Sequence, residues 1–179
     1  FGQHGDMSKA MRLIEQANQI GVSKQSAGLK LEAGSLSEIA ALKHLDKLPT
    51  GIDELDYFLD GGLPRGSLGI VVGGSGDGKS MCLSQTAAAA AAQGCCTLYA
   101  TLELPEPVVL ARLTSSLTQV PLHKLLAGSP IAEERLNKLA SKLGPTRIRE
   151  FTAKATTSED ILAWVDEVAR LENRRVDCL

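Results

Sequence analysis

A glycine-rich stretch with one lysine and one serine carries the residues best suited to chemistry in this chain. Residues 73–80 have the sequence GGSGDGKS and fit the pattern G-x-x-x-x-G-K-[ST]. An apolar run, residues 68–72, precedes this stretch, and a helix-forming run, residues 81–93, follows it. A phosphate-binding loop needs this context, because a strand delivers the chain, glycines let it turn tightly, and a helix N-terminus faces the anion. The pattern predicts a nucleotide-binding loop; the alternative is an ordinary glycine-rich turn.

The residue types in the 73–80 loop have distinct expected roles. Glycines lack a Cβ and reach positive φ, so backbone N–H groups can converge on phosphate oxygens. Lys79 is placed to reach the β- and γ-phosphates, where it would act in catalysis, and the Ser80 hydroxyl is placed to coordinate Mg²⁺. The residues expected to contact the nucleotide are Gly73, Gly74, Ser75, Gly76, Asp77, Gly78, Lys79, Ser80 and Met81.

Asp77 is an unusual residue inside such a loop. A carboxylate beside phosphates is unfavourable unless it points away from them. Because Asp77 occupies a variable position of the pattern, we expect its side chain to point outward.

A single carboxylate follows the next predicted strand. Glu103 comes at the end of the strand expected at residues 96–102. In parallel α/β sheets the carboxyl ends of the strands line the ligand crevice, so this carboxylate is expected to face the γ-phosphate. There it can orient a water molecule and accept its proton during phosphoryl transfer. The alternative is that Glu103 caps the helix that begins near Pro105, since an acid is favourable at a helix N-terminus.

The rest of the chain predicts the elements that would position these residues. Strands are expected at residues 68–72, 96–102 and 147–151, with a fourth beginning at 176–179. Helices are expected at residues 52–59, 81–93, 105–117, 121–126 and 131–143, and from a cap at Thr156 and Glu159 to residue 171. Strands that alternate with helices indicate an α/β fold, with a parallel sheet flanked by helices. Trp164 is expected in its core.

Residues 1–47 are expected to form a helical extension or linker, ahead of a core domain at residues 48–179. Asp6 can cap one helix, and Ser35 with Glu38 forms a capping box for a second. Neither helix could bury its apolar stripe alone. Each therefore needs a partner surface, on the core domain or on a neighbouring subunit.

Composition and charge argue against several classes of protein. The 179 residues include 19 basic and 21 acidic side chains, a net charge of −2, so no overall basic surface indicates nucleic acid. The longest apolar run, residues 86–92, is too short to cross a bilayer. The four cysteines have no C-x-x-C spacing, which argues against a zinc site and for a reduced, cytoplasmic setting. Cys95 and Cys96 are expected to be small buried residues at the start of a strand, with a redox pair as the alternative.

Several strings around these motifs resemble the RecA-type ATPase superfamily. They are LPTGI-x-x-LD at residues 48–56, GGLP-x-G at residues 61–66, and the 73–80 loop. Within that superfamily the chain is similar to DnaB-type replicative helicases at TLELP (residues 101–105), ARL (111–113) and LLAG (125–128). The resemblance implies a RecA-like P-loop fold that binds and hydrolyses ATP with Mg²⁺. In that family the acid equivalent to Glu103 activates the attacking water.

The resemblance also implies partners. Members act on nucleic acid and assemble as rings or filaments, with active sites between subunits. We therefore expect a homo-oligomer that binds nucleic acid, in particular single-stranded DNA, through regions beyond Leu179, and that does not enter a membrane. Because the chain begins at Phe1 instead of methionine, we expect it to be part of a longer protein.

At one point the sequence departs from the family pattern. The Walker B aspartate of the family follows an apolar run, whereas Asp177 precedes any such run. We therefore interpret Asp177 as a residue at the start of a strand and not as a Mg²⁺ ligand. The arginine finger and DNA-binding loops of the family have no assigned counterpart in this sequence.

Four functions remain to be separated. The first hypothesis is an ATP-driven motor of the RecA/DnaB class that translocates on or unwinds nucleic acid. The alternative within the superfamily is a KaiC-like or RecA-like ATPase in signalling or recombination. A hypothesis of another class is an assembly subunit that binds nucleotide without turnover. A small-molecule kinase is disfavoured, because no lid-like arginine-rich insertion is visible.

Overall fold

The computed structural model describes residues 46–179. The helical extension predicted for residues 1–47, including its caps at Asp6 and at Ser35 with Glu38, lies outside the described residues except at its last two positions. The domain boundary at residue 48 stays a prediction.

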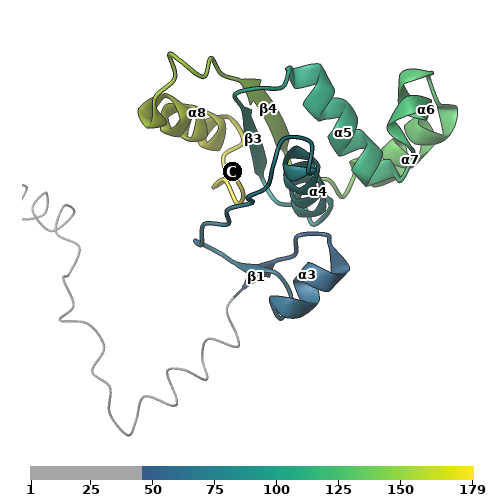
Figure 1. Cartoon of the computed structure of the whole chain (residues 1–179), viewed down its shortest axis with the longest axis horizontal. Helices are drawn as coiled ribbons and strands as arrows, with labels where there is room; N and C mark the ends of the chain where they lie inside the picture. The colour runs from purple at the N-terminus through teal and green to yellow at the C-terminus, as the bar shows by residue number, and fades with distance from the viewer. Residues whose placement is uncertain (1–45) are drawn as a thin grey trace, which may run out of the picture. The chain divides into compact units, whose positions relative to one another are not determined.

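Helices and short strands alternate along the described residues (Figure 1). The strands are β1 (Lys47–Leu48), β2 (Leu63–Pro64), β3 (Thr97–Thr101) and β4 (Thr146–Glu150). The helices are α3 (Asp53–Phe58), α4 (Lys79–Ala92), α5 (Glu106–Thr118), α6 (Leu122–Leu126), α7 (Pro130–Ala140) and α8 (Ser158–Leu171). Prolines stand at the starts of α5, α6 and α7, where the fixed φ suits a first turn and the missing N–H costs nothing. All the helices predicted for this part of the chain are present.

The central strand β3 lies between two parallel neighbours (Figure 1). On one side it pairs with β4, with Leu98 opposite Arg147. On the other side Thr97 forms a parallel bridge with Cys178, and the Leu98 N–H donates to the Cys178 carbonyl at 2.8 Å. The fourth strand predicted at residues 176–179 is therefore present only as a single bridge. The result is a small parallel sheet in a mixed α/β domain.

Residues 68–72 were expected to form a strand, and this prediction is wrong for the structure. The segment has no regular secondary structure and pairs with no described strand. Its apolar side chains are exposed, with Ile70 at 75% and Val72 at 88%. A strand is defined by its ladder of hydrogen bonds to a neighbour, and composition alone cannot supply that neighbour. The segment borders a mainly apolar cleft of about 400 Å³, which Tyr99 and Cys178 also line.

Helices cover both faces of β3. Leu98 belongs to a buried cluster with Trp164 and Val168 of α8, while the next residue, Tyr99, packs against a cluster formed by residues of α4 and α5 that includes Ala87. Successive side chains of a strand point to opposite faces, so α8 and α4 lie on opposite sides of the sheet. Trp164 is buried, as predicted, and its ring meets that of Phe151 edge-on at 5.6 Å between centroids.

The alanine-rich helix α4 lies very close to the sheet. Four of its alanines, Ala87, Ala88, Ala90 and Ala91, are at most 5% exposed. Small side chains let the helix axis approach the strands without loss of packing. Cys95 and Cys96, directly after the helix, are buried with free thiols, as predicted.

The cap of α8 lies one residue later than the sequence pattern predicted. Thr156 and Glu159 were expected to form a capping box, but Thr157 and Asp160 form it. The Thr157 N–H donates to Asp160 Oδ2 at 2.8 Å, and the Asp160 N–H donates to the Thr157 hydroxyl at 3.3 Å. Both pairs have the S/T-x-x-acid spacing, so the spacing alone does not decide between them.

Candidate nucleotide-binding site

The 73–80 loop turns directly into α4. Gly76 and Gly78 have φ of +88° and +87°, a conformation that a residue with a Cβ adopts only at a cost. Gly78 is the N-cap of α4, and the Cys82 N–H donates to its carbonyl at 2.9 Å as the first helical bond. The N–H groups of the first helical turn, at Lys79 and Ser80, consequently have no acceptor within the helix. This geometry suits an anion.

Lys79 folds back over the loop that precedes it. Its ammonium donates to the Gly73 carbonyl at 2.9 Å and to the Gly74 carbonyl at 2.5 Å. Both contacts are to backbone oxygens at the start of the loop. The lysine charge is therefore held over the turn where the sequence predicts phosphate binding.

Ser80 lies in the first turn of α4 and is half-buried. Its carbonyl accepts a hydrogen bond from the Ser84 hydroxyl at 2.7 Å. Its own hydroxyl makes no hydrogen bond to any described residue. A serine oxygen beside bound phosphates can supply one ligand to Mg²⁺, whose other ligands are usually phosphate oxygens and water. The residue type and position fit that role.

Glu103 lies at the same edge of the sheet as the N-terminus of α4. Ala90 shares a buried cluster with Cys95, ahead of β3, whereas Tyr99, nearer the end of the strand, packs against the cluster that contains Ala87. The helix therefore runs antiparallel to β3, and its first residues lie toward the carboxyl end of the strand. Glu103 follows that end and is exposed.

No hydrogen bond or ion pair of the described residues joins Glu103 to Lys79 or Ser80. The structure therefore places these three residues at the same edge of the sheet but not in contact with one another. The alternative, in which Glu103 caps α5, has no supporting contact, because the N-cap of that helix is Pro105 and no side chain caps it. The acid in its first turn is Glu106, whose carboxylate accepts the Glu150 N–H at 2.9 Å.

Asp77 does not point away from the loop, and that prediction is wrong. The Gly74 N–H donates to Asp77 Oδ2 at 2.6 Å. A short acidic side chain readily satisfies a backbone N–H three residues earlier, as in helix caps. This local bond holds the carboxylate against the loop.

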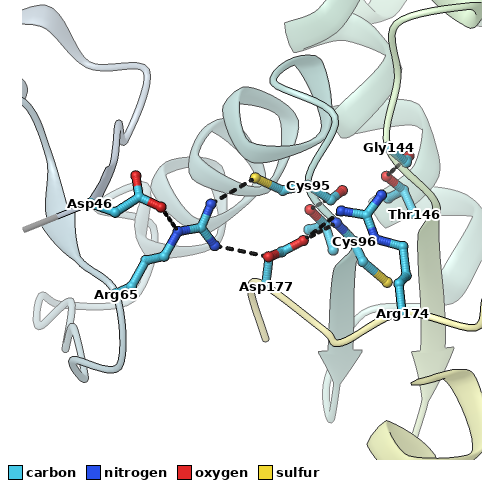
Figure 2. A network of polar contacts seen from close by, with 9 residues as sticks. Asp46, Arg65, Cys95, Cys96, Gly144, Thr146, Arg174 and Asp177 are labelled. Carbon is cyan, nitrogen blue, oxygen red and sulfur yellow. Dashed lines mark hydrogen bonds and ion pairs between the residues drawn. The ribbon is translucent and has the colours of Figure 1, made fainter.

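A cluster of charged side chains joins the segment before the loop to the sheet (Figure 2). The Arg65 guanidinium donates to Asp46 at 2.5 Å and to Asp177 Oδ1 at 2.9 Å. The other oxygen of Asp177 accepts the Cys96 N–H at 2.8 Å and Arg174 at 3.0 Å. One carboxylate thus ties the lead-in of the 73–80 loop to the first residues of β3. Asp177 acts structurally, in agreement with its interpretation as a residue at the start of a strand.

These donors set the ionisation of Asp177. Burial alone would raise the pKa of its carboxyl group, but the Cys96 N–H and the guanidinium charges of Arg65 and Arg174 outweigh burial and hold the pKa below its ordinary value. The carboxylate therefore stays charged at neutral pH.

A second carboxylate, Asp56, organises the Pro-Thr-Gly segment. It accepts the Thr50 N–H at 2.7 Å, the Thr50 hydroxyl at 2.8 Å and the Gly51 N–H at 3.0 Å. The Gly51 carbonyl in turn accepts Gln85 Nε2 of α4 at 3.0 Å. A Cβ on Gly51 would lie 2.8 Å from the Cβ of Ala89. These contacts hold the Pro-Thr-Gly segment against α4, the helix that begins with Lys79.

Sequence reasoning used these residues as signs of resemblance and missed their role. The signal available was the Thr-Gly pair followed by an aspartate, because an acid near the start of a helix tends to accept N–H groups just ahead of that helix. The roles of Arg65 and Asp177 had no such signal, since 112 residues separate them.

Comparison with known proteins gives two matches. A family model described as "ATPase: KaiC" matches residues 48–120. A curated protein, the DNA repair protein RadA of Campylobacter jejuni subsp. jejuni serotype O:2, is 31% identical over 160 residues. That match covers 76% of this chain and 36% of the relative. The chain therefore spans about a third of the length of RadA.

Both matches support the RecA-type P-loop superfamily. The family match includes the Thr50–Asp56 segment, the 73–80 loop, β3 and α5. Kinship with DnaB-type helicases in particular is not part of either match. Among residues 46–179, no helix is long and apolar enough to cross a membrane.

Proposed function

We propose that this domain binds ATP with Mg²⁺ and hydrolyses it, as a RecA-type ATPase that works on DNA. The observation that carries the proposal is the 73–80 loop, in which Lys79 is held over the turn and the N-terminus of α4 presents N–H groups without helical acceptors. These groups suit a triphosphate. The KaiC-type family match supports an ATPase, and the name of the RadA relative supports DNA as the partner.

Each residue has a proposed task. Lys79 neutralises charge on the β- and γ-phosphates, and Ser80 holds Mg²⁺, which neutralises further charge as it develops during phosphoryl transfer. Glu103, at the same edge of the sheet, orients the attacking water and takes its proton. Residues 73–81 supply the remaining contacts. Assembly into a ring or filament, which the RecA-type resemblance implies, is part of the proposal.

The test is ATP turnover by the full-length protein, with and without single-stranded DNA. We expect Lys79→Ala to weaken nucleotide binding by about 1.5–3 kcal/mol, or roughly ten- to a hundredfold, because a charge-assisted contact is lost. Glu103→Gln is expected to lower turnover about 100- to 10,000-fold with binding retained, since proton transfer is impaired.

The matched controls are Lys154→Ala and Glu133→Gln, which alter the same residue types at exposed positions. Both should leave binding and turnover unchanged. If nucleotide binds equally well to wild type and Lys79→Ala, the site assignment is wrong. Binding without turnover in the wild type would instead indicate the assembly subunit.

A DnaB-type helicase is a second candidate, favoured by the TLELP string around Glu103 and the helix that follows it. A strand-displacement assay on a forked DNA substrate separates it from the first proposal. Unwinding coupled to ATP supports the helicase. Stimulation of turnover by DNA without unwinding supports a RadA- or RecA-like role, and turnover indifferent to DNA supports a KaiC-like role.

A further inference from the structure

The 73–80 loop contains one negatively charged side chain, that of Asp77. The Asp77 carboxylate accepts the Gly74 N–H at 2.6 Å, and the Asp77 N–H donates back to the Gly74 carbonyl at 3.4 Å. These two bonds close a small turn within the 73–80 loop. The carboxylate thereby occupies one of the backbone donors of the loop.

Asp77 and Lys79 converge on the same two glycines. The Lys79 ammonium contacts the carbonyls of Gly73 and Gly74. A Cβ on Gly73 would lie 3.2 Å from the Asp77 Cβ, and a Cβ on Gly74 would lie 3.0 Å from Asp77 Oδ2. The absence of side chains at these glycines gives the carboxylate room to lie flat on the backbone. A negative and a positive charge are thus held within one short turn.

A fixed negative charge in this place acts against phosphate binding. Two like charges a few ångströms apart repel by about 1 kcal/mol in water, and by more where water is partly excluded. The 73–80 loop is largely exposed, so the smaller figure applies. The repulsion should grow with the number of phosphate charges on the ligand.

We propose that Asp77 weakens the affinity of the loop for nucleotide phosphates, and more for triphosphate than for diphosphate. The carboxylate does so by holding the Gly74 N–H and by setting a negative charge beside the phosphates. This inference rests on the proposed nucleotide binding at the same loop. Asp77 is then a residue that sets affinity, and the domain releases nucleotide more readily than it would with a neutral residue at this position.

The experiment compares Asp77→Asn with wild type in the full-length protein. Asparagine keeps an oxygen that can accept the Gly74 N–H, so the turn is retained while the charge is removed. We expect a non-hydrolysable ATP analogue with Mg²⁺ to bind about three- to tenfold more tightly to the variant. ADP should gain less and AMP least, and the gains should shrink at high salt because exposed charges are screened. Dissociation constants from calorimetry provide the readout.

Two further variants separate charge from structure. Asp166→Asn removes the same charge from an exposed position on α8 and should change none of the affinities. Asp77→Ala removes both the charge and the acceptor, and it should also bind the triphosphate more tightly than wild type. The role of Asp77 is overturned if wild type binds nucleotide and Asp77→Asn binds it no more tightly. It is also overturned if the variant gains as much affinity for AMP as for the triphosphate. Either result leaves the proposed nucleotide binding intact. Failure of every variant to bind any nucleotide overturns the proposed function as well.

Discussion

At the residue scale, Asp177 shows how a single side chain can position a distant loop. Its carboxylate joins Arg65, ahead of the 73–80 loop, to the Cys96 N–H at the start of β3. Each bond to a charged partner contributes about 1.5–3 kcal/mol when it is well shielded, but Arg65 is partly exposed, so the ion pair itself contributes less. The bond to the backbone N–H is the part that an uncharged replacement would keep.

The lowered pKa of Asp177 predicts a dependence of stability on pH. Because the carboxyl group has a lower pKa in the folded protein than in the unfolded chain, its contribution is complete above the unfolded value, near pH 4. The contribution is lost as pH falls through the folded value. Asp177→Asn should therefore flatten the fall in the free energy of unfolding on the acidic side of pH 4, as measured by urea denaturation at a series of pH values.

The control variant for this pH dependence removes a carboxylate that is not expected to stabilise the fold. Asp166→Asn, at an exposed position on α8, should retain the wild-type dependence. If Asp177→Asn and wild type lose stability in parallel down to pH 2, the contacts of Asp177 contribute nothing to folding.

At the element scale, the short β1–β2 pair fixes the route of the chain into the loop. Leu48 lies opposite Leu63 in antiparallel register. Gly62, next to this pair, has φ of +126°, and a Cβ there would lie 2.3 Å from the Leu48 carbonyl oxygen. The backbones approach so closely that only glycine fits.

Gly62→Ala should therefore destabilise the protein by about 3 kcal/mol or more, because both the strained φ and the backbone clash must be relieved. Gly66→Ala is the matched comparison, since Gly66 also has positive φ, +78°, but nothing lies within 4 Å of its Cβ position. That change should cost only about 1–2 kcal/mol. Thermal unfolding of both variants gives the measurement, and equal losses would show that close packing at Gly62 does not matter.

The sequence was sufficient to predict those helices and turns whose signal lies within a few neighbouring residues. Helix periodicity, the prolines at helix starts and Gly94 after α4, with φ of +79°, all act within one turn. The shifted cap of α8 shows the limit of such signals, because two overlapping pairs satisfied the same pattern. Residues 68–72 show a deeper limit: their apolar composition is that of a buried parallel strand, but pairing depends on a distant neighbour that composition does not identify.

In the candidate site, too, features with a local sequence signal were predictable, and features that depend on distant or unpaired groups were not. The 73–80 loop was predictable because glycines, lysine and serine act at fixed spacing within it. The inward position of Asp77 was not, since it depends on one N–H that lacks another acceptor. The links of Asp177 and Arg65 arise only when the folded chain brings residues far apart in sequence together.

At the scale of the whole molecule, residues 68–72 border a cleft and add no strand to the described sheets. Leu68 and Gly69 line the cleft, together with the bridged residue Cys178.

Because residues 68–72 pair with no described strand, we expect their backbone amides to exchange with solvent much faster than those of β3, since paired strand amides open only with the fold. Mass spectrometry of peptides that cover both segments provides the comparison. Residues 152–154, in an exposed turn before α8, serve as the unprotected reference. Protection of residues 68–72 to the same degree as β3 would show that this segment pairs as a strand, contrary to the structure.

The alanine-rich face of α4 has a consequence for sequence variation. Ala88, Ala90 and Ala91 have almost no exposed surface, and a larger side chain at any of them would push the helix outward together with Lys79 at its first position. A library randomised at these three positions and selected for function should return glycine, serine or cysteine beside alanine, and little else. Natural drift along this helix should be confined to its outer surface.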